Sequence, residues 1–299
     1  MKLNTIKHLL MGATFASLLA APATINAQPI AHYVPGSEGL FAATLPPPGI
    51  YLRDYNAFYY ADQLNDINGN KINGVSPKAF VYAQVPRLIW ITDLQVLGGN
   101  IGFDGLVPFE YQAAKVGGFD DHTFGVGDPF VEATWSAHTK QFDFALGFGT
   151  WIPTQNFNPQ NPTWAGQGYF GYMFTAGATW YIDTDRKWSI SALNRYEINA
   201  VQADTGITPG TVYTVEGGIG YAVSKIVTVG AAGYYQQRVN GNVGDHSTGD
   251  LPRTSGIGPE IATFFPSIML GVSLRYEYGF LAEDLFQGST VMLTVTKRF

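Results

Sequence analysis

The sequence predicts an all-β protein, a transmembrane antiparallel β-barrel of about twelve strands. Segments of alternating apolar and polar residues recur from residue 49 to residue 299. Turn-forming residues separate these segments, and long connections alternate with short ones. Past residue 27, no apolar run reaches the roughly 20 residues that a membrane helix needs. A barrel accounts for these observations, because its strands alternate and its turns are short at one end and long at the other.

Residues 288–299 form the most regular predicted strand. Val291, Leu293 and Val295 share one face, while threonines and Arg298 share the other, and the chain ends on Phe299. Alternation alone would also suit a soluble sheet with one wet face. A terminal aromatic residue on an amphipathic strand is instead typical of barrels assembled in the bacterial outer membrane. We therefore predict that Phe299 is an assembly signal, with the barrel assembly machinery, outer-membrane lipid and lipopolysaccharide as partners.

The N-terminus and the composition indicate an exported protein. Lys2 and Lys7 precede an apolar run, and residues 25–27 suit a cleavage site, so residues 1–27 are predicted to be a signal peptide. Loss of the two lysines would take the formal charge from −6 to −8. An acidic chain without basic runs argues against nucleic acid as a partner. The chain has no cysteine, which excludes disulfides and cysteine metal sites.

Residues 28–48 are too rich in proline and glycine for the interior of a helix or strand. Two placements are open for this segment. It either hangs in the periplasm or folds into the barrel mouth as a partial plug. The candidate plug residues are Tyr33, Phe41, Pro46, Pro47 and Pro48. The barrel itself is predicted over residues 49–299.

The predicted connections alternate in length along the chain. The strands are expected near residues 49–60, 79–92, 100–112, 126–137, 141–153, 168–182, 187–199, 211–223, 225–238, 257–265, 267–280 and 288–299. Tight turns are expected at residues 137–140, 183–186 and 265–266 and around Ser224, with a slightly longer link at 95–99. Long outer loops are expected at residues 61–78, 113–125, 154–167, 200–210, 240–256 and 281–287. Both termini then lie in the periplasm, which requires an even number of strands.

Charged strand residues are assigned to the inner face, because lipid tolerates them poorly and a lumen supplies water or partners. Either opposed rows of these charges shape a polar conduit, or they form a salt-bridged filling that seals a small barrel. Arg53 and Arg87 fit either face. The predicted lumen residues are Asp104, Glu110, Glu132, Asp143, Arg195, Glu197, Glu216, Glu260, Arg275, Glu277 and Arg298.

Aromatic residues make up 14% of the chain, as expected for a barrel with aromatic girdles. Trp135, Trp180, Tyr181 and Trp188 lie near predicted strand ends, where amphipathic rings suit the membrane interface. Asn194 is one of the weakest fits, because it falls on an otherwise apolar face.

Several motifs make the chain similar to a known family. They are His-Tyr-Val-Pro-Gly-Ser-Glu-Gly at residues 32–39, Leu-Pro-Pro-Pro-Gly-Ile-Tyr-Leu at residues 45–52 with Tyr55, Gly-Val-Gly-Asp-Pro at residues 125–129, and Trp-Ile-Pro-Thr at residues 151–154. Together with the closing strand, they resemble the outer-membrane proteins of the phenol meta-cleavage degradation pathway over essentially the whole mature chain. The resemblance implies an outer-membrane channel for passive uptake of small hydrophobic or aromatic solutes. The alternative is a closed structural or adhesive barrel whose outer loops bind a surface partner.

An enzyme and a metal site are less favoured interpretations. Two of the four histidines past residue 27, His122 and His246, fall in predicted outer loops, and no Gly-x-Ser-x-Gly motif occurs. Residues 120–122 are Asp-Asp-His, but adjacent side chains seldom converge on one ion. Residues 62–70 have part of the spacing of a calcium loop and lack its final glutamate. We therefore predict no catalytic residue, no metal and no cofactor.

Overall fold

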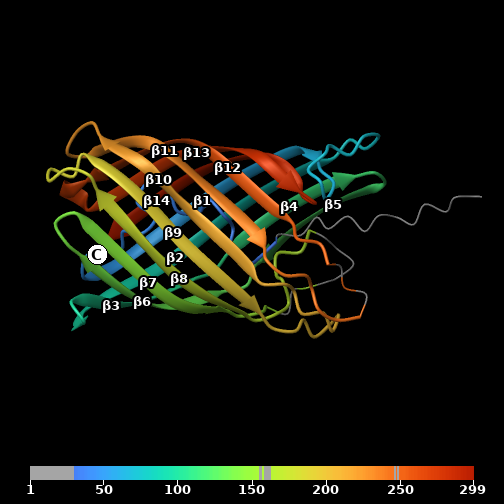
Figure 1. The fold of residues 1–299 in the computed structure, drawn as a ribbon, viewed down its shortest axis with the longest axis horizontal. Coiled ribbons are helices and arrows are strands. Elements are labelled where there is room, and N and C mark those ends of the chain that lie inside the picture. Colours follow the sequence, from blue (N-terminus) through green and yellow to red (C-terminus); the bar gives the residue numbers. More distant parts are fainter. Residues whose placement is uncertain (1–29, 155–156, 158–162, 246, 248) are drawn as a thin grey trace, which may run out of the picture.

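The strands of the computed structural model tilt around a closed barrel (Figure 1). The structure describes residues 30–154, 157, 163–245, 247 and 249–299, so the predicted signal peptide lies outside it. Neighbouring strands are antiparallel, and β1 pairs with both β14 and β2, which closes the sheet. The strands are β1 (Gly49–Leu64), β2 (Lys78–Val96), β3 (Gly99–Leu106), β4 (Phe109–Val116), β5 (Phe119–Val126), β6 (Phe130–His138), β7 (Phe142–Trp151), β8 (Gly171–Tyr181), β9 (Trp188–Asn199), β10 (Val212–Ala222), β11 (Val227–Arg238), β12 (Arg253–Phe265), β13 (Leu270–Glu283) and β14 (Phe286–Arg298).

The fourteen strands of the described residues make a twelve-stranded barrel, because two barrel strands are each split in two. β2 pairs with β3 along one half of its length and with β4 along the other. The next position repeats this arrangement, since β3 pairs with β6 and β4 pairs with β5. β3 and β4 are thus two halves of one barrel strand, and β5 and β6 are two halves of the next. The predicted fold class is confirmed.

Prolines mark both breaks. The predicted strand at residues 100–112 is interrupted at Val107 and Pro108, because proline has no N–H to give to the ladder. The second break covers residues 127–129, which end on Pro129. The Gly127 N–H donates to the Pro108 carbonyl at 2.9 Å, so the two breaks lie side by side in the wall.

The prediction of a long outer loop at residues 113–125 is wrong. β4 and β5 continue through this stretch as a hairpin that turns at Gly117 and Gly118 (Figure 1). Lys115 and Asp120 face each other across it, with 2.6 Å between Nζ and Oδ2. Charged and polar residues lie along both strands, so the apolar alternation that reveals a lipid-facing strand is missing here.

Three other boundaries differ from the predictions. The predicted long loop at 281–287 is a tight turn at residues 284–285, where Asp284 adopts a left-handed conformation with φ of 57° that aspartate tolerates. β12 begins at Arg253, inside the predicted loop at 240–256. The predicted strand at 267–280 begins only at Leu270, after a short 3-10 helix, η1 (Pro266–Ile268), with proline in its first turn. Among the described residues, no helix is long and apolar enough to cross a membrane.

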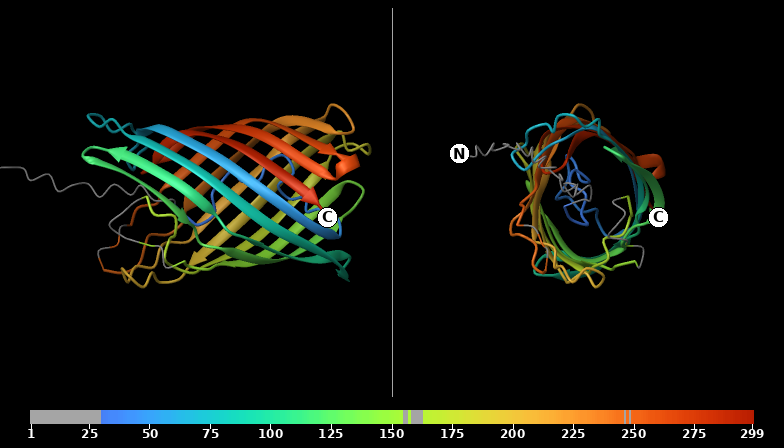
Figure 2. Two further views of the ribbon diagram at one scale, coloured as in Figure 1. Left: turned by 180° about the vertical axis from the view of Figure 1, so that it is seen from behind. Right: turned by 90° about the vertical axis from the view of Figure 1, so that its right-hand side faces the viewer.

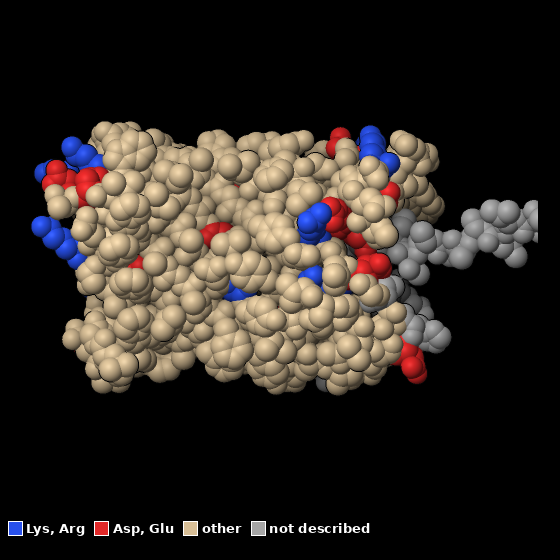
Figure 3. Space-filling model, viewed as in Figure 1, with Lys and Arg blue, Asp and Glu red and all other residues tan. Residues whose placement is uncertain are grey.

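The visible outer wall is almost free of charge, and charged side chains gather at the two ends of the barrel (Figure 3). Trp180 and Trp188 are 41% and 46% exposed on this wall, as interface residues should be. Tyr181 does not belong with them. It is buried, and its hydroxyl donates to Asp143 at 2.8 Å. Successive strand residues face opposite sides, so Trp180 and Tyr181 cannot both face lipid.

Asn194 is accommodated on the outer face by hydrogen bonds to its neighbours. Its side-chain amide donates to the Ala176 carbonyl at 3.3 Å. Its side-chain oxygen accepts a hydrogen bond from the Tyr213 hydroxyl at 2.6 Å on the adjacent strand. These contacts satisfy a polar group that lipid cannot hydrate.

Residues 30–48, hereafter the N-terminal segment, run inside the barrel toward the start of β1 (Figure 2). Leu40 is completely buried. The segment packs on the wall through small apolar clusters, so part of the lumen is filled like a protein core. These clusters join Ile30 and Ala31 to Val212, Tyr33 to Phe130, Trp151 and Met173, Ala42 and Ala43 to Ala145 and Leu193, and Leu45 to Tyr51, Ile89 and Ile91.

Candidate functional site: the lumen and the N-terminal segment

The charged residues assigned to the lumen from the sequence surround the N-terminal segment. Nine of the eleven are buried, while Glu110 and Arg298 are half-buried. A protein interior accepts charges only when they are paired or hydrated. Most of these charges are paired, and several bind the segment directly.

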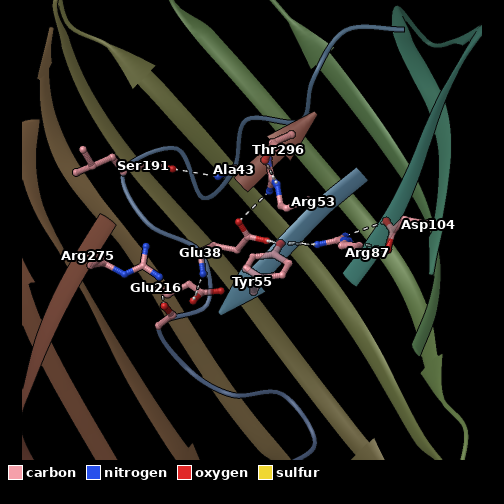
Figure 4. A network of polar contacts seen from close by, with 12 residues as sticks. Glu38, Ala43, Arg53, Tyr55, Arg87, Asp104, Ser191, Glu216, Arg275 and Thr296 are labelled. Atoms are coloured by element: carbon pink, nitrogen blue, oxygen red, sulfur yellow. Dashed lines mark hydrogen bonds and ion pairs between the residues drawn. The ribbon is translucent and has the colours of Figure 1, made fainter. Parts of the chain in front are cut away.

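Glu38 is the centre of the polar network (Figure 4). Its Oε2 lies 3.1 Å from Arg53 Nη1, and its Oε1 lies 3.3 Å from Arg87 Nη1. The Tyr55 hydroxyl donates to Oε1 at 2.7 Å. Burial alone would raise the pKa of Glu38, but Arg53 and Arg87 outweigh burial and hold the pKa below its ordinary value. The sequence did not assign these two arginines to a face of the wall. Their contacts with Glu38 place both on the inner face.

Arg87 links this centre to two predicted lumen carboxylates. Its Nε and Nη2 donate to the two oxygens of Asp104 at 2.9 and 2.8 Å, and Nη2 also lies 3.2 Å from Glu132 Oε2. A forked pair of this kind fixes the plane of the guanidinium group. Glu132 in turn accepts a hydrogen bond from Thr175 Oγ1 at 3.0 Å.

Glu216 holds the N-terminal segment at two further points. Its Oε2 accepts the backbone N–H of Glu38 at 3.1 Å, and its Oε1 accepts a hydrogen bond from the Tyr33 hydroxyl. Arg195 Nε lies 3.5 Å from the same Oε1. The guanidinium group of Arg195 also lies over the Tyr33 ring, 4.2 Å from its centroid. Tyr33 is therefore held by Arg195 over its ring and by Glu216 at its hydroxyl group.

Glu260 and Arg275 bind the backbone of the segment. The Leu40 N–H donates to Glu260 Oε2 at 3.0 Å, and Arg275 Nη2 donates to the Gly36 carbonyl. Arg275 also pairs with Glu260 at 3.1 Å and lies 3.4 Å from Glu277 Oε1. The predicted row of Glu260, Arg275 and Glu277 is therefore brought together, and it faces the segment.

Glycine is required where the segment meets this row. A methyl group at Gly39 would overlap the Glu260 carboxylate and the Arg275 guanidinium group. Gly36 has φ of +78°, and a methyl group there would meet Glu277. The two glycines allow the backbone to approach charged side chains that any other residue would push away.

The end of the segment is bound near the short turns. Ala43 donates its N–H to Ser191 Oγ at 3.1 Å, and Thr44 Oγ1 donates to Asp143 Oδ2 at 3.1 Å. Arg298 Nη2 donates to the Pro48 carbonyl at 2.8 Å. The predicted plug residues Phe41, Pro46 and Pro47 line a cavity described below.

His32 binds the other end of the segment. Its Nδ1 lies 2.8 Å from Glu197 Oε1, and its Nε2 lies 3.1 Å from Asp128 Oδ2. The ring stacks on Trp151 with 5.4 Å between centroids and contacts Tyr169 edge-on at 4.5 Å. Burial alone would lower the pKa of His32, but Glu197 and Asp128 outweigh burial and raise the pKa to about 9. The side chain is therefore a cation near neutral pH.

Two cavities flank the N-terminal segment along the barrel. The turn-side cavity has a volume of about 420 Å³ and is lined by Glu38, Phe41 and Arg298, among others. The loop-side cavity has a volume of about 240 Å³ and is lined by His32, Tyr33 and other residues. Within the described residues, no side chain lines both. The segment and its polar contacts therefore separate the two spaces.

Sequence reasoning missed five of the residues that hold this arrangement. His32, Glu38 and Asp128 were visible only as members of motifs, and Arg53 and Arg87 could not be assigned to a face. The motifs themselves were the usable signal. Residues 32–39, 125–129 and 151–154 meet at one place, because His32 contacts Asp128 and stacks on Trp151, while the Thr154 N–H donates to Asp128 Oδ1 at 2.8 Å.

The acidic stretches considered for metals are used within their own turns and strands. Asp66 Oδ1 accepts the N–H groups of Asn68 and Asn70 at 2.9 and 2.8 Å. Asp120 pairs with Lys115, and the His122 N–H donates to Asp121 at 2.8 Å. Among the described residues, no group of three or more potential ligands could hold a metal ion. His246 lies outside those residues.

Comparisons with solved structures place the fold among outer-membrane barrels. An outer membrane channel from Pseudomonas putida F1 superposes with a TM-score of 0.77 at 16% identity, covering 89% of this chain and 100% of that one. The beta domain of the Bordetella autotransporter BrkA gives a TM-score of 0.52 at 12% identity, covering 85% of this chain and 100% of that domain. At these identities the similarity establishes the fold alone. A comparison with curated proteins found no match.

A family model described as "Putative MetA-pathway of phenol degradation" matches residues 61–295, which is most of the chain. The match covers the barrel from the end of β1 to β14 and includes most of the wall residues that contact the N-terminal segment. The family resemblance drawn from the motifs is thereby confirmed. The chain belongs to the family of the MetA pathway of phenol degradation.

Proposed function

We propose that this protein is an outer-membrane channel for passive uptake of small hydrophobic or aromatic compounds. One observation carries the proposal. Two cavities lie in one barrel, no described residue lines both, and the N-terminal segment with its polar contacts lies between them. A solute could cross by displacing or passing this segment, and no energy-coupling group is needed for movement down a gradient.

The class of solute follows from the linings and from the family. The loop-side cavity is lined mainly by alanine, valine, proline and aromatic side chains, which suit a ring compound better than a strongly hydrated solute. The description of the family names a pathway of phenol degradation. Both considerations support a small aromatic substrate. The fold and the apolar outer wall support a location in the bacterial outer membrane.

A closed structural or adhesive barrel is the second candidate, and one observation favours it. Nearly all the predicted lumen charges have partners within the protein, so the polar filling could seal the barrel permanently. In that case the long loops, and not the lumen, would carry the function. The two candidates differ in whether a solute crosses.

The decisive measurement is solute flux into liposomes that contain the refolded protein, corrected for leakage through protein-free liposomes of the same lipid. The full mature chain is compared with a variant that lacks residues 28–44, and heat-modifiable gel mobility confirms folding of both. Saturable flux of a small aromatic solute that changes on deletion is the expected result. Absence of flux in both folded proteins would rule out the channel and favour the closed barrel.

A further inference from the structure

One carboxylate of the lumen differs from all the others. Of the eight acidic residues predicted to line the lumen, seven contact a histidine or arginine side chain, and only Glu110 lacks a cationic partner among the described residues. Its Oε2 accepts a hydrogen bond from Gln112 Nε2 at 2.6 Å. No group in the described part of the chain donates to its Oε1. Glu110 therefore keeps an unused acceptor.

Glu110 has open space beside it. It lines the loop-side cavity, and its partners on the two neighbouring strands are Ala83 and Gly125, whose side chains are too small to reach it. Small residues recur along this part of the wall. The alanines that line the cavity are Ala57, Ala79, Ala83, Ala113, Ala114 and Ala165. The volume of about 240 Å³ is large enough for a single aromatic ring with a small substituent.

An unused donor lines the same cavity. Trp151 is 5% exposed, and its indole Nε1 has no hydrogen-bond partner among the described residues. A buried N–H without a partner carries a desolvation cost that a ligand atom could relieve. The cavity thus offers one acceptor and one donor in largely apolar surroundings.

The other charged groups of the cavity are already occupied. Asp128 accepts hydrogen bonds from His32, from the Gln167 N–H and from Thr154, and His32 is held between Asp128 and Glu197. Among the described residues, no lysine or arginine lines the loop-side cavity. The turn-side cavity is different, because it is lined by Arg53, Lys225, Arg275 and Arg298.

Resting on the proposed channel function, we infer that the loop-side cavity selects uncharged ring compounds that carry a hydroxyl group and that Glu110 is the specificity-determining residue. A hydroxyl group can donate to Glu110 Oε1 and accept from Trp151 Nε1. A ring carboxylate is repelled by Glu110, and the one cation that lines the cavity among the described residues, His32, is already paired with Asp128 and Glu197. An ammonium group offers no acceptor to Trp151 and loses its hydration in apolar surroundings.

Calorimetric titration of the full mature protein in detergent at pH 8, above the value of about 7 to which burial raises the pKa of Glu110, tests this selectivity with four matched ring compounds. Phenol has the donor and the acceptor, anisole has only the acceptor, benzoate is an anion and benzylamine is a cation. Phenol is expected to bind at least about tenfold more tightly than each of the other three, as one hydrogen bond to a charged group predicts. Equal affinity for phenol and anisole, tightest binding of benzylamine, or no binding of any compound would each overturn the inference.

Two substitutions separate the hydrogen bond from the charge. Glu110→Leu removes the acceptor and should abolish the difference between phenol and anisole. Glu110→Gln keeps an acceptor but removes the charge, so it should retain phenol and admit benzoate. The matched control is Thr294→Val in the turn-side cavity, which should leave all four affinities unchanged. Heat-modifiable mobility confirms that each variant is folded.

Failure of this inference and failure of the channel give different results. Flux of phenol and benzoate at similar rates through the wild-type protein would refute selection by Glu110 and leave the channel intact. Selective binding without flux would retain the site and refute the channel.

Discussion

His32 is the cation that holds one end of the N-terminal segment, and its charge makes this attachment dependent on pH. Its pKa of about 9 in the folded protein lies above the ordinary value of 6.5. Protonation therefore stabilises the folded arrangement fully below pH 6.5, and this contribution is lost as the pH rises through about 9. We expect ion conductance of the reconstituted protein to increase between pH 7 and pH 10 as the segment loosens.

The control for this prediction is His32→Gln, which can form hydrogen bonds but carries no charge. Its conductance should be higher than that of the wild type at pH 7 and nearly independent of pH over the same range. A wild-type conductance that stays constant from pH 7 to pH 10 would contradict the role assigned to His32.

The Tyr213 hydroxyl compensates for a polar residue on the lipid face. Tyr213→Phe leaves the Asn194 oxygen without its 2.6 Å partner, and the expected loss of unfolding free energy is about 1 kcal/mol. Urea unfolding in lipid vesicles measures it. Tyr278→Phe is the matched control, because Tyr278 is also exposed on the outer face and its hydroxyl has no described partner. Equal stability of the two variants would show that Asn194 does not need Tyr213.

At the residue scale, side-chain direction was predictable and partners were not. Strand parity placed Arg195, Glu216 and Arg275 on the inner face, because successive residues must alternate. Parity says nothing about which charges meet. The Tyr33 contact to Glu216 spans 183 residues of sequence, and no local pattern encodes it.

At the scale of elements, the N-terminal segment depends on close approach to the wall. Gly39→Ala adds a methyl group that overlaps Glu260 and Arg275, so the segment should be displaced and conductance should rise. Single-channel recording measures the change. Gly118→Ala is the control, because nothing lies within 4 Å of the added methyl group in the β4–β5 hairpin. If both variants conduct like the wild type, the close packing at Gly39 does not keep the barrel closed.

The strands that cross lipid were predicted well, and those at the loop end were not. β9 alternates because one face meets lipid and the other meets the lumen. The β4–β5 hairpin has no such constraint, and its cross-strand pairs, such as Lys115 with Asp120, suit a strand as well as a loop. The breaks at Pro108 and Pro129 were equally hard to interpret from the sequence. Proline marks an interruption of a strand, but it does not show whether the barrel strand ends there or continues.

At the scale of the whole molecule, a substitution at the C-terminal residue tests assembly and stability separately. Phe299 is 74% exposed, and its backbone N–H donates to the Ile50 carbonyl at 3.0 Å. Phe299→Ala keeps this backbone bond, so unfolding free energy in vesicles should change by less than about 0.5 kcal/mol. If Phe299 is an assembly signal, the same variant should accumulate much less in the outer membrane of cells. Normal accumulation in cells would contradict that role.

The sequence by itself determined the barrel class of this protein and the side of the wall on which most strand residues fall, because lipid imposes a period of two on every segment that crosses it. Only the tertiary structure decided the rest. It placed residues 30–48 inside the barrel, between a turn-side and a loop-side cavity, and left Glu110 without a cationic partner among the described residues. These features depend on contacts between residues far apart in the chain, such as His32 with Glu197 and Glu38 with Arg87, and such contacts form only when the barrel closes around the segment.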